Sequence, residues 1–137
     1  MGLVLHHVFA SNAEEITSAI AEAASWNADA MIVVDSPLFT ANGARLAELA
    51  ILHRLPTVGG NSFLTRDELL LSYSGDVNVA LRQAADTVDR ILKGAKPADP
   101  PVQVITRFSL IINAKTAKAL GVTIPPTMVV LADEVIE

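Results

Sequence analysis

Short polar side chains follow two apolar segments of the sequence, at the points where buried strands would end. Residues 30–34 and 55–60 are the apolar segments. The residues that follow them are Asp35, Ser36, Pro37, Asn61, Ser62 and Phe63. Because open parallel sheets bind ligands beyond the carboxyl ends of their strands, we expect these residues to contribute to a small-molecule site. A third loop of this kind begins at Ser11, after the apolar residues 3–9. Hydroxyl, amide and carboxylate groups beside turns and helix N-termini can hold a polar ligand.

Asp35 carries the most specific chemistry of this group. Its carboxylate could pair with the ammonium group of a ligand, or it could cap the turn that follows the strand. A phosphoacceptor role would require a further acidic pair after the first strand to hold magnesium, and Ser11 and Asn12 stand there instead. Asn61 and Ser62 have the same two alternatives, hydrogen bonding to a ligand or forming a tight turn.

The sequence lacks the residue patterns that nucleophilic catalysis or metal binding would need. The sequence contains no cysteine and no G-x-S-x-G nucleophile motif. His6 and His7 are neighbours, so on a strand they would point to opposite faces and could not share a metal. We therefore expect no enzyme activity, no metal and no cofactor. The alternative is an enzyme with a flavodoxin-like or receiver-like fold. Such an enzyme needs a set of catalytic residues, and the sequence shows none.

The 137 residues allow one domain, 1–137, and 51% of them are hydrophobic while only 4% are aromatic. Such a mixture favours helices packed on a sheet. The net charge of −5 and the scattered basic residues argue against a nucleic-acid partner. No stretch approaches the length of a membrane span.

Hydrophobic periodicity predicts alternating strands and helices. The strands are expected at 3–9, 30–34, 55–60, 69–74 and 108–113, and the helices at 12–26, around 46–52, at 77–92 and at 116–120. We expect Ser11 and Glu14 to form a capping box and residues 61–63 to be a loop. The alternation predicts an α/β fold in which an open parallel sheet has helices on both faces.

Several motifs in the second half are similar to the end of ABC-transporter substrate-binding proteins. Residues 89–99 read DRILKGAKPAD, 108–121 read FSLIINAKTAKALG, 124–126 read IPP and 132–137 read ADEVIE. Residues 69–73, LLLSY, resemble the family's G-x-L-x-S-Y-G, although Ser74 stands where glycine is usual. The resemblance covers essentially the whole chain but only the later portion of the family.

The resemblance implies a type I periplasmic-binding fold, in which two α/β lobes close on a ligand and a membrane permease senses the closure. It adds Tyr73 to the expected site, and it implies a small polar ligand such as an amino acid, bound without catalysis. Family members are periplasmic and carry a signal peptide and a first lobe before this region. Residues 1–10 lack signal-peptide features, so the chain as written is expected to stay in the cytoplasm.

The resemblance also implies that residues 69–94, a strand and a helix, would pack on the first lobe. Without that lobe the apolar face of residues 77–92 would be exposed, and such patches are usually interfaces. We therefore expect a homo-oligomer that is formed through this face. In one form of this oligomer, the strand and helix would be exchanged between chains. The alternative function is a truncated, oligomerising relic that has no specific ligand.

Overall fold

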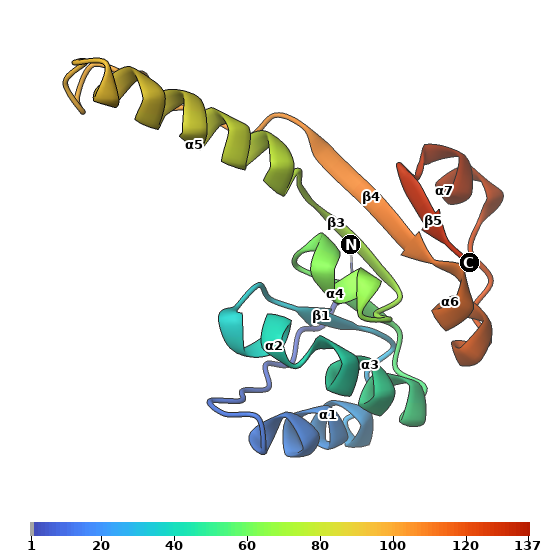
Figure 1. The fold of residues 1–137 in the computed structure, drawn as a ribbon. Helices are drawn as coiled ribbons and strands as arrows, with labels where there is room; N and C mark the ends of the chain where they lie inside the picture. The colour runs from blue at the N-terminus through green and yellow to red at the C-terminus, as the bar shows by residue number, and fades with distance from the viewer. Residues whose placement is uncertain (1) are drawn as a thin grey trace.

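Five strands form one sheet in the computed structural model, which describes residues 2–137. The strands are β1 (Met31–Val33), β2 (Thr57–Gly59), β3 (Leu71–Gly75), β4 (Phe108–Asn113) and β5 (Glu134–Ile136). They lie in the order β1-β2-β3-β4-β5 (Figure 1). Neighbouring strands are parallel except for β3 and β4, which are antiparallel. The predicted α/β fold is confirmed, and the sheet, which was predicted to be parallel, is mostly parallel.

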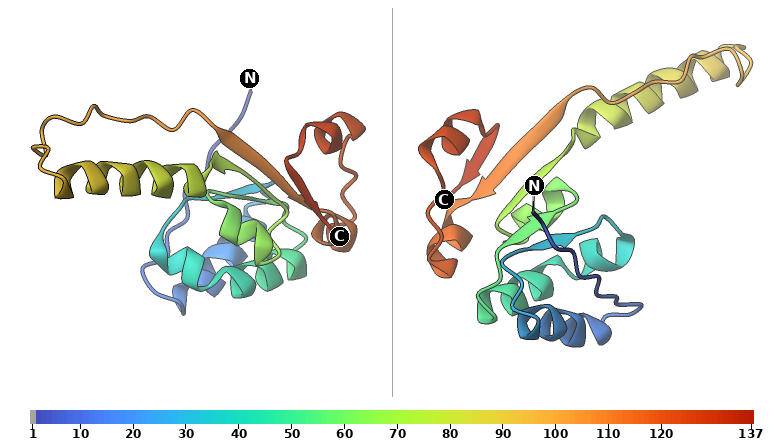
Figure 2. Two further views of the ribbon diagram at one scale, coloured as in Figure 1. Left: turned by 45° about the horizontal axis from the view of Figure 1, so that its top comes forward. Right: turned by 180° about the vertical axis from the view of Figure 1, so that it is seen from behind.

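The antiparallel pair is a departure from the predicted pattern, and the path of the chain explains it. The helix after β3 leads the chain away from the sheet, and residues 93–107 bring it back beside the end of β3 (Figure 2). β4 therefore begins where β3 ends, with Gly75 opposite Phe108. A strand that starts there can only run back along β3.

The helices differ in how much of their surface is buried. They are α1 (Glu15–Ser25), α2 (Pro37–Ala41), α3 (Gly43–Leu52), α4 (Ser62–Arg66), α5 (Val77–Leu92), α6 (Ala114–Leu120) and α7 (Pro126–Leu131). The core lies between α1, α3, α4 and the sheet, and its fully buried members include Ile16, Ile20, Leu46, Leu64 and Leu69. Their burial supplies most of the hydrophobic stabilisation of this part of the fold.

The predicted strand over residues 3–9 is wrong. The segment is extended, and within residues 2–137 it takes part in no backbone hydrogen bond. Strand-forming residue types are not sufficient, because a strand also needs a neighbour with which to pair. The segment lies against α1 instead, where His6 is hydrogen-bonded to Glu22 and stacks on Trp26.

Two local predictions are also corrected. The predicted loop at 61–63 instead begins α4, because the side chain of Asn61 accepts a hydrogen bond from the Leu64 N–H and caps the helix. The predicted capping box is displaced by one residue. The Asn12 side chain accepts from the N–H of Glu15, and the Glu15 carboxylate accepts from the N–H of Ser11.

α5 extends away from the rest of the molecule (Figures 1 and 2). Its bounds agree with the predicted helix at 77–92, and Asp76 caps it by accepting from the N–H groups of Asn78 and Val79. None of its residues is buried. Residues 93–107 run back along it (Figure 2), so helix and return segment together form an arm.

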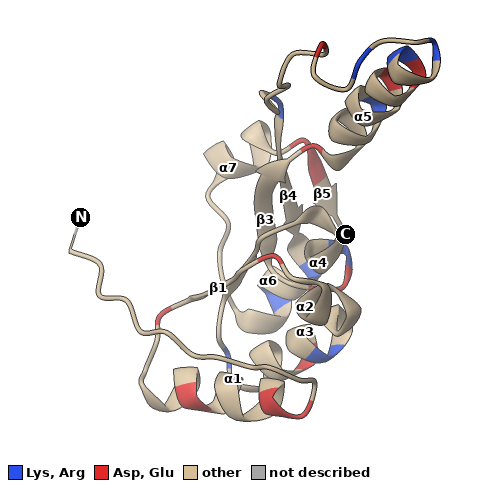
Figure 3. Cartoon of the chain, turned by 90° about the vertical axis from the view of Figure 1, so that its left-hand side faces the viewer, with Lys and Arg blue, Asp and Glu red and all other residues tan. Residues whose placement is uncertain are grey.

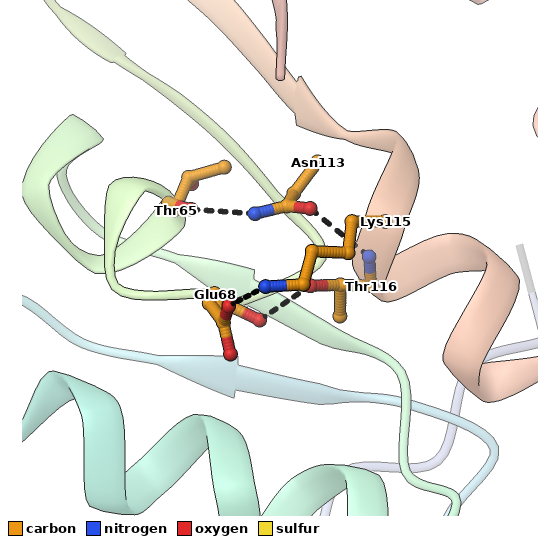
Figure 4. A network of polar contacts seen from close by, with 5 residues as sticks. All are labelled: Thr65, Glu68, Asn113, Lys115 and Thr116. Atoms are coloured by element: carbon orange, nitrogen blue, oxygen red, sulfur yellow. Dashed lines mark hydrogen bonds and ion pairs between the residues drawn. The ribbon is translucent and has the colours of Figure 1, made fainter. Parts of the chain in front are cut away.

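A polar network joins the two halves of the chain at the other end of β4 (Figure 4). The side chain of Asn113, which is 1% exposed, donates to the Thr65 carbonyl and accepts from the Thr116 N–H at the start of α6. The Thr116 hydroxyl donates to the Glu68 carbonyl, and the ammonium group of Lys115 pairs with the Glu68 carboxylate. Three polar residues of the N-A-K-T motif thus fasten α6 to the turn between α4 and β3.

Replacing Asn113 should therefore be costly, whereas replacing Lys115 should not. Asn113→Ala leaves a buried carbonyl and a helix N–H unpaired, and we expect it to lower the free energy of unfolding by about 2–3 kcal/mol. Lys115→Ala removes an exposed ion pair, and we expect a loss below about 1 kcal/mol. Urea unfolding of the two variants beside the parent measures both values, and equal losses would contradict this account of the motif.

Candidate functional site

The carboxyl ends of β1, β2 and β3 meet at one edge of the sheet. Val33 is paired with Gly59, and Gly59 with Ser72. Since these strands are parallel, residues two positions further along each strand come to the same level. The register therefore places Asp35 beside Asn61, as the sequence predicted.

Asn61 is the structural centre of this edge. Its side-chain amide donates to Asp35 Oδ1 at 2.6 Å and to the Thr40 hydroxyl at 3.0 Å, while its oxygen accepts from the Leu64 N–H at 3.1 Å. Only 6% of the residue is exposed. Its hydrogen-bonding groups are thus used within the protein, and Asn61 holds the carboxylate of Asp35 in place.

Asp35 is exposed and faces solvent at the end of β1. Its Oδ1 accepts the amide of Asn61, and Oδ2 has no partner in the part of the chain that the structure describes. A carboxylate with one oxygen fixed and the other open can receive a cationic or hydrogen-bonding group at a defined position.

A close approach between the ends of β1 and β2 brings the two loops together. The N–H of Gly60 donates to the Val33 carbonyl at 2.8 Å. A Cβ atom on Gly60 would lie 2.6 Å from the backbone nitrogen of Asp35. Glycine at this position therefore allows the hydrogen bond between Asn61 and Asp35 to form.

Ser36, Pro37 and Ser62 lie in the first turns of short helices. The Ser36 hydroxyl accepts from the Phe39 N–H and caps α2, whose first residue is Pro37. Ser62 is the first residue of α4 and is half-buried. The sequence left open a capping role for Asp35 in this loop, whereas in the structure the cap of α2 is Ser36.

Aromatic side chains add an apolar surface near this edge. Phe63 in α4 is 52% exposed and Tyr73 in β3 is 64% exposed. The rings of Tyr73 and Phe108 are stacked with centroids 5.5 Å apart, an arrangement that suits offset aromatic pairs. Sequence reasoning missed the contact of Phe108 with Tyr73, because this contact depends on the antiparallel register of β3 and β4.

Metal and membrane sites receive no support from the described residues. Within residues 2–137, no three His, Asp or Glu side chains are grouped so that they could hold a metal ion. In the same range, no helix combines the length and the apolar character needed to cross a membrane. The Lys, Arg, Asp and Glu residues are distributed over many elements of the chain (Figure 3).

Residues 1–136 match the family model for ABC transporter substrate binding protein. The chain therefore belongs to the family of ABC transporter substrate-binding proteins. Members of this family bind solutes rather than catalyse reactions, and they typically act in the periplasm or outside the cell. A search of curated proteins gave no significant match.

Solved structures agree with this assignment. The chain is similar to an ABC domain from Streptococcus pneumoniae in complex with L-Trp, with 27% identity and a TM-score of 0.87 over 98% of this chain and 46% of that one. A conserved domain protein from Vibrio cholerae gives 25% identity and a TM-score of 0.84 over 92% and 42%. A substrate-binding protein with adhesive properties from Clostridium difficile, 19% identical, shares the fold, with a TM-score of 0.62 over 85% and 39%. The chain thus spans less than half of each of these proteins.

The bond between Asn61 and Asp35 leads to a prediction about stability. Asn61→Asp keeps an oxygen that can cap α4 but places two carboxylates within hydrogen-bond distance, which raises the pKa of one of them in the folded state. A raised folded-state pKa favours the folded protein at low pH and disfavours it once the pH rises through that pKa. We therefore expect the variant to lose stability relative to the parent between acidic and neutral pH, as measured by urea unfolding.

The control for this variant exchanges the two side chains. Asp35→Asn combined with Asn61→Asp restores one amide and one carboxylate, so stability at pH 7 should recover relative to Asn61→Asp alone. If the single variant showed the same pH dependence as the parent protein, Asn61 and Asp35 would not be in contact.

Proposed function

We propose that this chain forms one wall of the ligand site of an ABC-type importer and binds a small polar solute such as an amino acid. In this proposal residues 1–137 are one α/β domain, the second lobe of a type I periplasmic-binding fold. The residues of the ligand site are Asp35, Ser36, Pro37, Asn61, Ser62, Phe63 and Tyr73, and Asn61 acts there by holding the Asp35 carboxylate. A first lobe, which this chain does not span, would close over the ligand, and a membrane permease would sense the closure.

The observation that carries the proposal is the fixed position of the Asp35 carboxylate. Its carboxylate is held by Asn61 at the carboxyl ends of the parallel strands and keeps one oxygen open. A fixed carboxylate is a suitable partner for the ammonium group of an amino acid, because charge-assisted hydrogen bonds are stronger than neutral ones. Orientation by Asn61 lowers the entropy lost when the ligand binds.

The exposed aromatic residues support a ligand that also has an apolar part. Phe63, Tyr73 and Phe108 expose ring surface near the same edge of the sheet. Rings of this kind can pack against aliphatic or aromatic groups of a solute. The similar Streptococcus pneumoniae domain was solved with L-Trp, which makes aromatic amino acids the first ligands to test.

The arm supports a second element of the proposal, which is association through α5. Leu81, Val88 and Leu92 are 63%, 54% and 82% exposed and lie on one face of the helix. In the whole fold this face, with residues 69–94, would pack on the first lobe. In a chain without that lobe, we propose that the face pairs with a second copy of the chain. One form of this dimer would have the arm exchanged between the two copies. This association is also what the alternative function, an oligomerising relic without a ligand, would require.

Calorimetric titration with a panel of amino acids that includes L-Trp tests the ligand site. One wall should bind weakly, because the ligand stays solvated on its other side. Asp35→Asn removes the charge from the hydrogen bond to the ligand, and we expect it to weaken binding by about tenfold or more. Asp86→Asn changes the same charge on the exposed surface of α5 and should leave the affinity unchanged. Binding that survives Asp35→Asn intact would remove Asp35 from the site.

Light scattering over a range of protein concentrations tests the association. Leu81→Asp places a charge on the apolar face of α5, and we expect it to shift the protein to the monomer without unfolding it, since α5 has no buried residue. Gln83→Asp introduces the same charge away from that face and should leave the oligomer intact. A parent protein that is monomeric at high micromolar concentration would exclude this interface.

A further inference from the structure

The outer edge of β1 has backbone groups that no strand pairs. β1 is the end strand of the sheet. The Met31 N–H donates to the Pro56 carbonyl, and the Val33 carbonyl accepts from the Gly60 N–H, so both residues face β2. Backbone groups alternate in direction along a strand. Those of Ile32 therefore point outward, to the edge that is unpaired among residues 2–137.

A second unpaired segment runs along the same side of the molecule. Residues 3–9 are extended and apolar apart from two histidines, and they take part in no backbone hydrogen bond of the described chain. Leu3, Leu5 and Phe9 are 77%, 74% and 82% exposed. These are strand-forming residue types that have no neighbouring strand in the described chain.

The segment is aligned with β1 in direction. His6 contacts Glu22 and Trp26 near the end of α1, whereas Ala10 lines a cavity together with Ile16 near its beginning. Residues 3–10 thus run antiparallel to α1. The chain reverses again through residues 26–30 into β1, so the segment and β1 run in the same direction.

An apolar cavity separates the segment from β1. It has a volume of about 100 Å³, with Val8 and Ala10 on one side and Met31, Ile32 and Val34 on the other. Neither residues 2–13 nor residues 30–34 contain a Lys, Arg, Asp or Glu (Figure 3). The two unpaired backbones therefore face an uncharged gap and do not pair with each other. We call this gap the strand slot.

We propose that the strand slot receives one further β-strand, an apolar segment from the portion of the fold that the solved relatives have and this chain does not span. Such a strand would form backbone hydrogen bonds with β1 on one side and with residues 3–9 on the other. Its side chains would be apolar on both faces. One face would lie over the cavity that Ile16 and Ile20 help to line, and the other would lie beside Ile32 and Val34, which are each 70% exposed.

Two observations favour this occupant over a second copy of the chain. The matched region covers only 46% of the Streptococcus pneumoniae chain and 42% of the Vibrio cholerae chain, so those proteins have ample polypeptide to supply a strand. The segment that a second copy could offer, its own residues 3–9, is held to α1 by the contacts of His6. A second copy would have to break these contacts before it could enter the slot.

Peptide binding to the 137-residue protein tests the proposal. The probes are overlapping 12-residue peptides that cover the part of the Streptococcus pneumoniae protein outside the matched region, each with a scrambled control. We expect one apolar peptide to bind and to slow hydrogen exchange at the amide of Ile32, which faces the slot, but not at Met31, which already faces β2. The scrambled form should do neither.

A backbone variant makes the test specific for strand pairing. Ile32→Pro removes the outward N–H and leaves the groups of Met31 and Val33 that pair with β2, so we expect it to weaken peptide binding at least tenfold. Ile32→Ala removes the exposed side chain, keeps the N–H and should weaken binding less. Circular dichroism and urea unfolding check that both variants fold.

Three outcomes would overturn the proposal. The first is that no peptide from the unmatched portion binds above its scrambled control, and the second is that Ile32→Pro binds as well as Ile32→Ala. The third is that exchange at Ile32 slows as the concentration of the protein alone is raised, which would identify a second copy as the occupant. None of these outcomes bears on amino-acid binding at Asp35, which the calorimetric titration tests separately.

Discussion

The antiparallel pairing of β3 with β4 is the interaction on which the rest of the structure depends. It joins the parallel strands β1 to β3, which come before the arm, to β4 and β5, which come after it. The ladder continues beyond the strands, because the Asp76 N–H donates to the Arg107 carbonyl at 3.0 Å. At its other end, Asn113 binds the last turn of α4 and Thr116 binds the turn between α4 and β3. The base of the arm and the edge of the candidate site are therefore parts of one sheet.

The candidate site shows how a structural residue can prepare a functional one. Asn61 caps α4 with its oxygen and holds Asp35 with its nitrogen. The two contacts share one side chain, so the start of α4 and the position of the Asp35 carboxylate are coupled. Gly60 makes the arrangement possible, because a side chain there would separate the two loops. Orientation of this kind lowers the entropy that is lost when a ligand binds, because folding fixes the carboxylate before any ligand arrives.

The sequence predicted best the features that depend on neighbouring residues along the chain. The limits of α5 and β4 were predicted correctly because a long amphipathic pattern and a bounded apolar run determine them locally. The proximity of Asp35 and Asn61 followed from the parallel arrangement of the strands they end. The direction of β4, and with it the contact of Tyr73 with Phe108, could not be predicted, because it depends on the path of residues 93–107. Residues 3–9 have strand propensity but no partner, which no local pattern reveals.

The exposure of α5 has a consequence for how the arm folds. Most helices in proteins owe their stability to packing of an apolar face, and isolated helices of about this length are marginal in water. The cap at Asp76 and the exposed pair of Lys93 with Asp89 are local interactions that contribute little each. Whatever covers the apolar face therefore also stabilises the helix itself, so ordering of the arm and occupation of its surface are thermodynamically linked. A partner that covered this face would fold the arm as it bound, and the helicity of α5 would then measure how much of the face is occupied.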